Sequence, residues 1–185
     1  MPIEAELKAR VRNVKDTRER LRSRAIERTA VYRDTYYDRP GQELTSEGRE
    51  LRVRVVEWDT DRRVLLTYKA PAVDEASGSK PEHETRVGSP EVLDEILHGL
   101  GFEHHVRLVK HCANFTFTAE DREFTATLVT VPELDGTFLE VETLVADEEL
   151  TEGLAAVRRV IADLGINDDD LTTEQYTDAV RQKRA

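Results

Sequence analysis

Residues 3–11 read IEAELKARV, and apolar side chains alternate there with charged ones. The charged positions are Glu4, Glu6, Lys8 and Arg10, two acids followed by two bases. A period of two residues is the pattern of a β-strand with two unlike faces, because successive side chains of a strand point to opposite sides. The stretch therefore predicts a strand with one apolar face and one face that carries charges of both signs.

The same spacing of charged residues recurs in other predicted strands. The further sets are Arg52 and Arg54 in 51–58, Glu82 and Glu84 with Arg86 in 82–87, and Glu140 and Glu142 in 137–144. For any one set, a solvated strand face is the simpler interpretation. Acids and bases alone fill these positions, however, although Glu and Lys are poor strand formers. We therefore favour a sheet that closes into a barrel and turns its charged faces inward.

The remaining pattern predicts further short strands and a few helices. Strands are expected over 31–38, 64–69, 106–117 and 123–131, and helices over 13–24, 91–100, about 150–164 and 173–183. The total is about eight strands, mostly antiparallel, with three or four helices. Many short antiparallel strands favour a barrel or a sandwich over a doubly wound sheet. We expect one domain of the α+β class, mainly antiparallel β, that spans residues 1–185.

Composition narrows the class of protein. Charged residues make up 35% of the chain and the formal net charge is −11, which argues against a general nucleic-acid or anionic-membrane binder. Cys112 is the only cysteine, so no intrachain disulfide can form. No apolar run reaches the length of a membrane span, and no secretory signal is evident. We expect a cytoplasmic protein with no nucleic-acid or membrane partner, and we leave a homodimer open.

A barrel interior that holds carboxylates and cations together indicates a particular chemistry. Carboxylates bind a hard divalent cation, and Arg and Lys bind phosphate oxygens. The pattern thus suits a metal-bound polyphosphate. His104, His105 and His111 also lie close in sequence, but His104 and His105 point to opposite faces of any strand. We therefore predict no metal site that those two neighbours share.

Several segments, in order along the chain, resemble the CYTH family, also called triphosphate tunnel metalloenzymes. Glu4-x-Glu6-x-Lys8 matches the ExExK signature of that family. The later segments that resemble it read VYRDTYYD, GRELRVR, LLTYKAP, KPEHETRV, LGF followed by Lys110, FLEVE and EQYTDAV. The family takes in class IV adenylate cyclases, thiamine triphosphatases and inorganic triphosphatases.

The resemblance implies an eight-stranded antiparallel tunnel with helices packed outside. It implies that a triphosphate is bound inside by Lys8, Arg52, Arg54, Lys69 and Lys110; Arg86, on the same strand face as Glu82 and Glu84, is a further candidate. It also implies that Mg²⁺ or Mn²⁺ is held by several of Glu4, Glu6, Glu84, Glu140 and Glu142.

Two positions depart from the family pattern. Cys112 stands where the family usually has an Arg two residues after the late basic Lys, here Lys110. The stretch LVTVPEL lacks the Asp that the family often carries before the late acidic pair. His111, Arg107 and Arg122 are candidates to replace the missing phosphate ligand.

The resemblance favours a class IV adenylate cyclase, in which the ribose 3′-hydroxyl of ATP attacks the α-phosphorus. The alternatives are a triphosphatase that hydrolyses tripolyphosphate, thiamine triphosphate or a nucleoside triphosphate, and a non-catalytic polyphosphate-binding domain. For hydrolysis, Lys69 is the candidate catalytic residue that positions or deprotonates water, because a lysine buried among cations has a lowered pKa.

Overall fold

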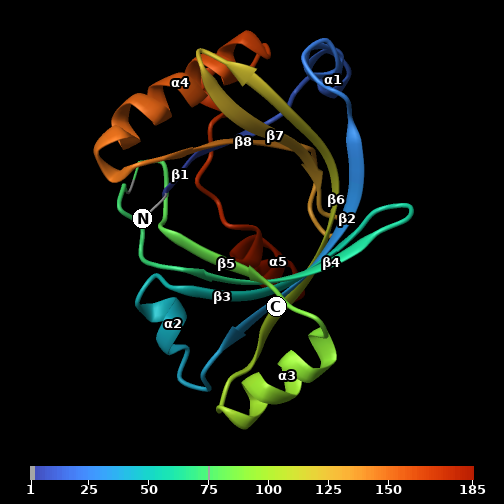
Figure 1. Cartoon of the computed structure of the whole chain (residues 1–185), viewed down its shortest axis with the longest axis vertical. Helices are drawn as coiled ribbons and strands as arrows, with labels where there is room; N and C mark the ends of the chain where they lie inside the picture. The colour runs from blue at the N-terminus through green and yellow to red at the C-terminus, as the bar shows by residue number, and fades with distance from the viewer. Residues whose placement is uncertain (1–2, 75) are drawn as a thin grey trace.

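The computed structural model describes residues 3–74 and 76–185, which form one curled sheet with helices around it (Figure 1). The strands are β1 (Ile3–Arg10), β2 (Arg28–Asp38), β3 (Glu50–Glu57), β4 (Arg62–Lys69), β5 (Glu82–Arg86), β6 (Glu103–Ala119), β7 (Arg122–Thr130) and β8 (Phe138–Val145). The helices are α1 (Val14–Arg22), α2 (Glu43–Ser46), α3 (Pro90–Gly99), α4 (Leu150–Asp163) and α5 (Tyr176–Arg184). Short 3₁₀ turns at Asp147–Glu149 and Asp168–Asp170 complete the elements.

All eight strands belong to one antiparallel sheet in the order β1-β8-β7-β6-β2-β3-β4-β5. The predicted eight antiparallel strands are therefore confirmed. β1 and β5 are the two ends of the sheet, and its curl brings them near each other (Figure 1). An isolated bridge between Ile3 and Pro81 joins these ends. The curl gives the sheet a concave inner face and a convex outer face.

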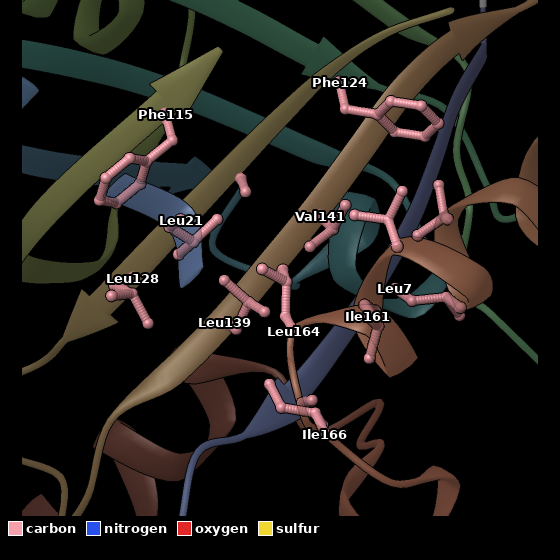
Figure 2. Packing of buried hydrophobic residues seen from close by; sticks show 14 of the residues in the cluster. Leu7, Leu21, Phe115, Phe124, Leu128, Leu139, Val141, Ile161, Leu164 and Ile166 are labelled. Atoms are coloured by element: carbon pink, nitrogen blue, oxygen red, sulfur yellow. The ribbon is translucent and has the colours of Figure 1, made fainter. Parts of the chain in front are cut away.

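The outer face carries the apolar positions that the alternation predicts. Leu7 of β1 and Val141 of β8 pack with Ile161 of α4 in the largest buried cluster (Figure 2). Phe115 and Phe124 are fully buried in the same cluster, and burial of a large apolar side chain contributes about 1.5–3 kcal/mol. These contacts place the apolar face of β1 outward and its charged face inward.

Two local features let the helices cover this outer face. A Cβ atom at Gly153 would lie 2.7 Å from a methyl group of Val145, so glycine allows α4 to pack closely on β8. On the other half of the sheet, Leu93 and Leu97 of α3 pack against Val53 of β3. The apolar cluster under α4 and the one under α3 thus shield the convex side of the sheet from solvent.

The helix at the C-terminal end lies differently from the other helices. Tyr176 and Val180 of α5 pack with Leu108, Val129 and Phe138 in a separate buried cluster on the concave side. Figure 1 shows α5 within the curl of the sheet, whereas α1, α3 and α4 lie outside it. The expectation of helices packed outside thus describes the other helices, and α5 covers one part of the interior instead.

The described residues contain five α-helices, whereas the sequence predicted three or four. The additional helix is α2, which is four residues long and too short to show a helical period. Asp38 stabilises it, because its carboxylate accepts hydrogen bonds from the backbone N–H groups of Leu44 and Thr45, each at 2.9 Å. Within the described part of the chain, no helix is long and apolar enough to cross a membrane.

Candidate functional site

A polar cavity of about 290 Å³ opens on the concave face of the sheet. Strands from both halves of the sheet, a loop before β5 and the start of α5 line it. Its charged lining residues among those described are Glu4, Glu6, Lys8, Glu50, Arg52, Arg54, Lys69, Lys80, Glu82, Glu84, Lys110, Glu140 and Glu142. Of the residues predicted to bind phosphate or metal, only Arg86 and the three candidate replacements for the missing arginine lie outside this cavity.

Strand register explains why these side chains meet. Glu6 of β1 lies opposite Glu142 of β8, and Lys8 lies opposite Glu140. Side chains that are directly opposite on antiparallel strands share a face and lie close together. The period-two spacing of each acidic or basic set thus keeps the whole set on the concave face.

Glu4, Glu6 and Glu142 form a compact carboxylate group. One oxygen from each lies within 4.8 Å of the others. Burial, together with the charges of Glu82 and Glu6, raises the pKa of Glu4 to about 7 although Lys69 opposes the change. Burial and neighbouring acids likewise raise the pKa of Glu6 and of Glu142. These carboxylates carry more negative charge than their surroundings balance, as expected of ligands for a hard divalent cation.

Lys69 lies between the two ends of the sheet. Its Nζ is 3.1 Å from a carboxylate oxygen of Glu4 and 2.7 Å from one of Glu82. Burial lowers the pKa of Lys69, but Glu4, Glu6 and Glu82 outweigh that effect and raise it above its usual value. The prediction of a lowered pKa was wrong, because the nearest neighbours of Lys69 are acids. Burial does lower the pKa of Lys8, a phosphate-binding candidate for which no pKa change was predicted.

The two arginines of β3 differ in their partners. Arg54 makes a bidentate ion pair with Asp34 of β2, with both N–O distances at 2.7 Å. Burial raises the pKa of Asp34, but Arg54 outweighs it and holds that pKa well below its usual range. Arg52 donates from Nη2 to Thr67 at 3.2 Å, and its buried Nε has no hydrogen-bond partner among the described residues. Arg52 thus retains a free donor, whereas Arg54 is largely committed to Asp34.

Lys8 and Lys110 both lie close to one aromatic ring. Their Nζ atoms are 4.4 Å and 4.3 Å from the ring centroid of Tyr176, within the range of cation–π attraction. Lys110 also lies 3.7 Å from Glu140. Tyr176 belongs to the EQYTDAV segment, and its ring thus fixes the position of two cations in the cavity.

Some predicted ligands lie apart from the carboxylate group. Glu84 accepts a hydrogen bond from Thr67 at 2.9 Å and sits at the more exposed side of the cavity. Arg86 is exposed and lines a separate hollow beside the start of α3. Arg86 therefore lies apart from the other candidates, because β5 is an edge strand of five residues and its last residue lies beyond the cavity.

The departures from the family pattern can now be located. Cys112 is buried on the concave side, and burial raises the pKa of its thiol to about 12. None of the described candidates to replace the missing Arg lines the cavity: His111, Arg107 and Arg122 lie elsewhere. Strand alternation explains this for His111, since Lys110 and Cys112 on either side of it face inward.

Sequence reasoning missed several residues of the cavity. Glu82 was noted only as part of a charged set, and Asp34, Glu50 and Lys80 were not considered as site residues. Lys80 and Glu50 form an ion pair at 2.5 Å at the cavity wall. Glu82 had a usable signal, because it shares the period of Glu84. The others depend on how strands and loops pair, which one segment alone does not reveal.

Comparisons with known proteins identify the family and the fold. The family model described as "CYTH domain" matches residues 2–176. A Methanocaldococcus jannaschii protein named "Putative adenylate cyclase" is 25% identical over 179 residues, which cover 94% of this chain and 96% of that protein.

Two solved structures share the fold. The PH1819 protein of Pyrococcus horikoshii OT3 has a TM-score of 0.85 and 28% identity, with 98% of this chain and 99% of that chain covered. A Hippeastrum protein described as a "putative adenylyl cyclase" with a dominant triphosphatase activity has a TM-score of 0.68 and 15% identity, with 98% and 96% covered. Because the family model spans nearly the whole chain, with the charged cavity in its midst, this chain belongs to the CYTH family.

Proposed function

We propose that this chain is a divalent-cation-dependent enzyme that acts on a triphosphate-containing small molecule in the polar cavity. One observation carries the proposal: a group of three carboxylates lies beside several buried cations in a single cavity. Among the described lining residues, seven acidic side chains face six basic ones, so the cavity is short of positive charge when all of them are ionised. A divalent cation would correct that balance and leave the basic side chains free for phosphate.

Glu4, Glu6 and Glu142 are the proposed ligands of Mg²⁺ or Mn²⁺. All three offer oxygen atoms, which these hard cations prefer, and burial together with neighbouring acids raises the pKa of each. When bound there, the ion neutralises charge on phosphoryl oxygens. Glu140 and Glu84, also expected as ligands, instead contact Lys110 and Thr67, so we assign them to positioning those residues.

Arg52, Lys8 and Lys110 are the proposed phosphate-binding residues. The guanidinium of Arg52 lines the cavity and is not tied to an acid by a bidentate pair, and charge-assisted hydrogen bonds to phosphate are among the stronger ones in proteins. Lys69 remains protonated at neutral pH, because acids surround it, so we assign it to holding phosphate rather than to removing a proton. Arg54 acts mainly through Asp34, which fixes its guanidinium at the cavity wall.

Two reactions can use this arrangement. In a class IV adenylate cyclase, the ribose 3′-hydroxyl attacks the α-phosphorus and pyrophosphate leaves. In a triphosphatase, water attacks the terminal phosphorus and orthophosphate leaves. In both, fixed cations stabilise charge that builds on the phosphoryl oxygens. The cyclase is our first candidate, supported by the name of the Methanocaldococcus relative.

The triphosphatase is the second candidate, and the cavity lining favours it. Charged side chains dominate that lining, so it matches a triphosphate better than an apolar nucleobase. The Hippeastrum protein, described with triphosphatase activity, shares the fold.

Product identification separates the candidates. The purified chain is incubated with ATP, GTP or tripolyphosphate in the presence of Mg²⁺ or Mn²⁺. Cyclic nucleotide with pyrophosphate identifies the cyclase, and orthophosphate identifies the triphosphatase. Glu6→Gln should abolish either reaction, whereas Lys15→Ala, on the exposed surface of α1, should preserve it. Absence of product from every substrate would contradict an enzyme and leave the polyphosphate-binding domain.

A further inference from the structure

A second cluster of potential metal ligands lies on the outer side of the sheet. Asp94 and His98 are four residues apart on α3, so they share one face of that helix. His104 comes from the start of β6, just after the turn that follows α3. One ligand atom from each of the three lies within 4.8 Å of the others. This His-His-Asp cluster shares no residue with the polar cavity.

A β-bulge brings His104 into the cluster. Tyr36 pairs with Val106 and Tyr37 pairs with His104, so His105 is an extra residue in β6. Without it, His104 would share the face of Val106, whose side chain is buried on the concave side. The bulge instead turns His104 to the outer face, toward Tyr37 and α3. Bulges often re-aim a single side chain in this way.

The three side chains already contact one another. His104 Nε2 lies 2.5 Å from Asp94 Oδ1, and the rings of His98 and His104 are 4.7 Å apart between centroids. His98 Nδ1–H donates to the backbone carbonyl of Asp94 at 2.8 Å, which holds the ring and leaves the lone pair on Nε2. Metal-binding histidines commonly donate their other ring N–H to a backbone carbonyl or a carboxylate.

Asp94 is suited to bind a cation. The hydroxyl of Tyr37 donates a hydrogen bond to Asp94 Oδ1 at 2.6 Å, which orients the carboxylate. Burial raises the pKa of Asp94, but hydrogen bonds from Tyr37 and His104 outweigh it and hold that pKa below its usual value. The side chains of Asp94, His98 and His104 are 35%, 43% and 28% exposed, so an ion can reach them from solvent.

We propose that Asp94, His98 and His104 form a second metal site, selective for a borderline transition-metal ion such as Zn²⁺ rather than for Mg²⁺. Two imidazoles and one carboxylate are typical protein ligands of Zn²⁺, whereas Mg²⁺ demands oxygen ligands. The ion takes the place of the hydrogen bond between His104 Nε2 and Asp94 Oδ1. It ties the end of α3 to the start of β6 across the turn at residues 100–102.

One neighbour opposes binding in the present arrangement. Arg107 is exposed, and its Nη2 lies 2.8 Å from His104 Nδ1. A guanidinium beside a metal-binding imidazole repels the ion, so Arg107 turns away when the site fills. Removal of this charge should therefore tighten binding.

Zn²⁺ titration of purified variants tests the proposal. Zn²⁺ should bind the wild type and raise its melting temperature, and His98→Gln/His104→Gln should lose the part of both effects that the His-His-Asp cluster supplies. His105→Gln is the matched control, because it removes the adjacent histidine of the same strand and should leave binding unchanged. Tyr37→Phe should weaken binding by about tenfold, as loss of an outer partner typically does. Arg107→Ala should strengthen it.

The test is made independent of the polar cavity by repeating it in Glu6→Gln/Glu142→Gln. Zn²⁺ binding at the His-His-Asp cluster should persist there, whatever becomes of the proposed enzyme activity. Co²⁺ bound in that background should show the visible absorption of a low-coordinate site with nitrogen ligands. Undiminished Zn²⁺ affinity in the folded His98→Gln/His104→Gln variant, or an equal loss in His105→Gln, would overturn the proposal.

Discussion

Lys69 Nζ on β4 lies 3.1 Å from Oε2 of Glu4, although β1 is one end of the eight-stranded sheet and β4 lies next to the other end. The same nitrogen lies 2.7 Å from Glu82 on β5. One lysine thus joins carboxylates from both edge strands. Closure of the curled sheet and assembly of the charged cavity therefore depend on the same contact.

Replacement of Lys69 should weaken the fold as well as the site. Lys69→Met leaves Glu4 and Glu82 buried without their shared cation, and loss of one partner of a buried pair typically costs about 3–5 kcal/mol. The free energy of unfolding, measured by urea denaturation at neutral pH without metal, should fall by about 3 kcal/mol. Lys15→Met, which alters an exposed lysine of α1, is the control. Equal stability of the two variants would show that the contact does not close the sheet.

Glu142→Gln should stabilise the metal-free protein as pH rises. Burial and the nearby acids Glu4 and Glu6 raise the pKa of Glu142 well above its unfolded value. A raised pKa favours the folded state below the unfolded value near 4.5, and that advantage is lost as pH rises through the folded pKa. The variant, which cannot ionise, should therefore gain stability over the wild type as pH rises above the unfolded value. Thermal denaturation at a series of pH values above the unfolded pKa measures the difference, with the exposed Glu103→Gln as control. Parallel curves of melting temperature against pH for all three proteins would show that the crowded carboxylates do not destabilise the metal-free fold.

The two arginines of β3 should respond differently to replacement by alanine. Arg52→Ala should leave the fold nearly intact and remove about 1.5–3 kcal/mol of stabilisation by bound tripolyphosphate, because Arg52 has a free donor. Arg54→Ala leaves the buried Asp34 carboxylate without its cation and should lower the free energy of unfolding by about 3–5 kcal/mol. Asp34→Asn in the Arg54→Ala background should recover part of that loss. Equal effects of both arginines on ligand binding alone would contradict the assigned roles.

Much of the fold was predictable from the spacing of apolar and charged residues. The period of two in β1, β3 and β8 fixed which side chains share a face, since one face of each strand had to be buried. Glu4, Arg52 and Glu140 therefore reach one cavity as the pattern indicated. Ser89 likewise caps the start of α3, where its side chain accepts a hydrogen bond from the N–H of Val92. Gly101 follows the end of that helix with a positive φ of 85°.

Features that depend on contacts between distant segments were not predictable. Asp34 meets Arg54 only because β2 and β3 pair in that register, which alternation within one strand cannot reveal. The bulge at His105 reverses the face of His104, so the argument from neighbouring histidines missed its pairing with α3. The acids around Lys69 come from two other strands, and for that reason its pKa was predicted in the wrong direction.

Binding of Mn²⁺, followed by electron paramagnetic resonance, tests the central claim most directly. The claim is that Glu4, Glu6 and Glu142 hold a divalent cation inside the cavity. The wild type and the His98→Gln/His104→Gln variant should each bind Mn²⁺, and the Glu6→Gln/Glu142→Gln variant should lose that binding while it remains folded. Mn²⁺ affinity that is unchanged in Glu6→Gln/Glu142→Gln would contradict the account.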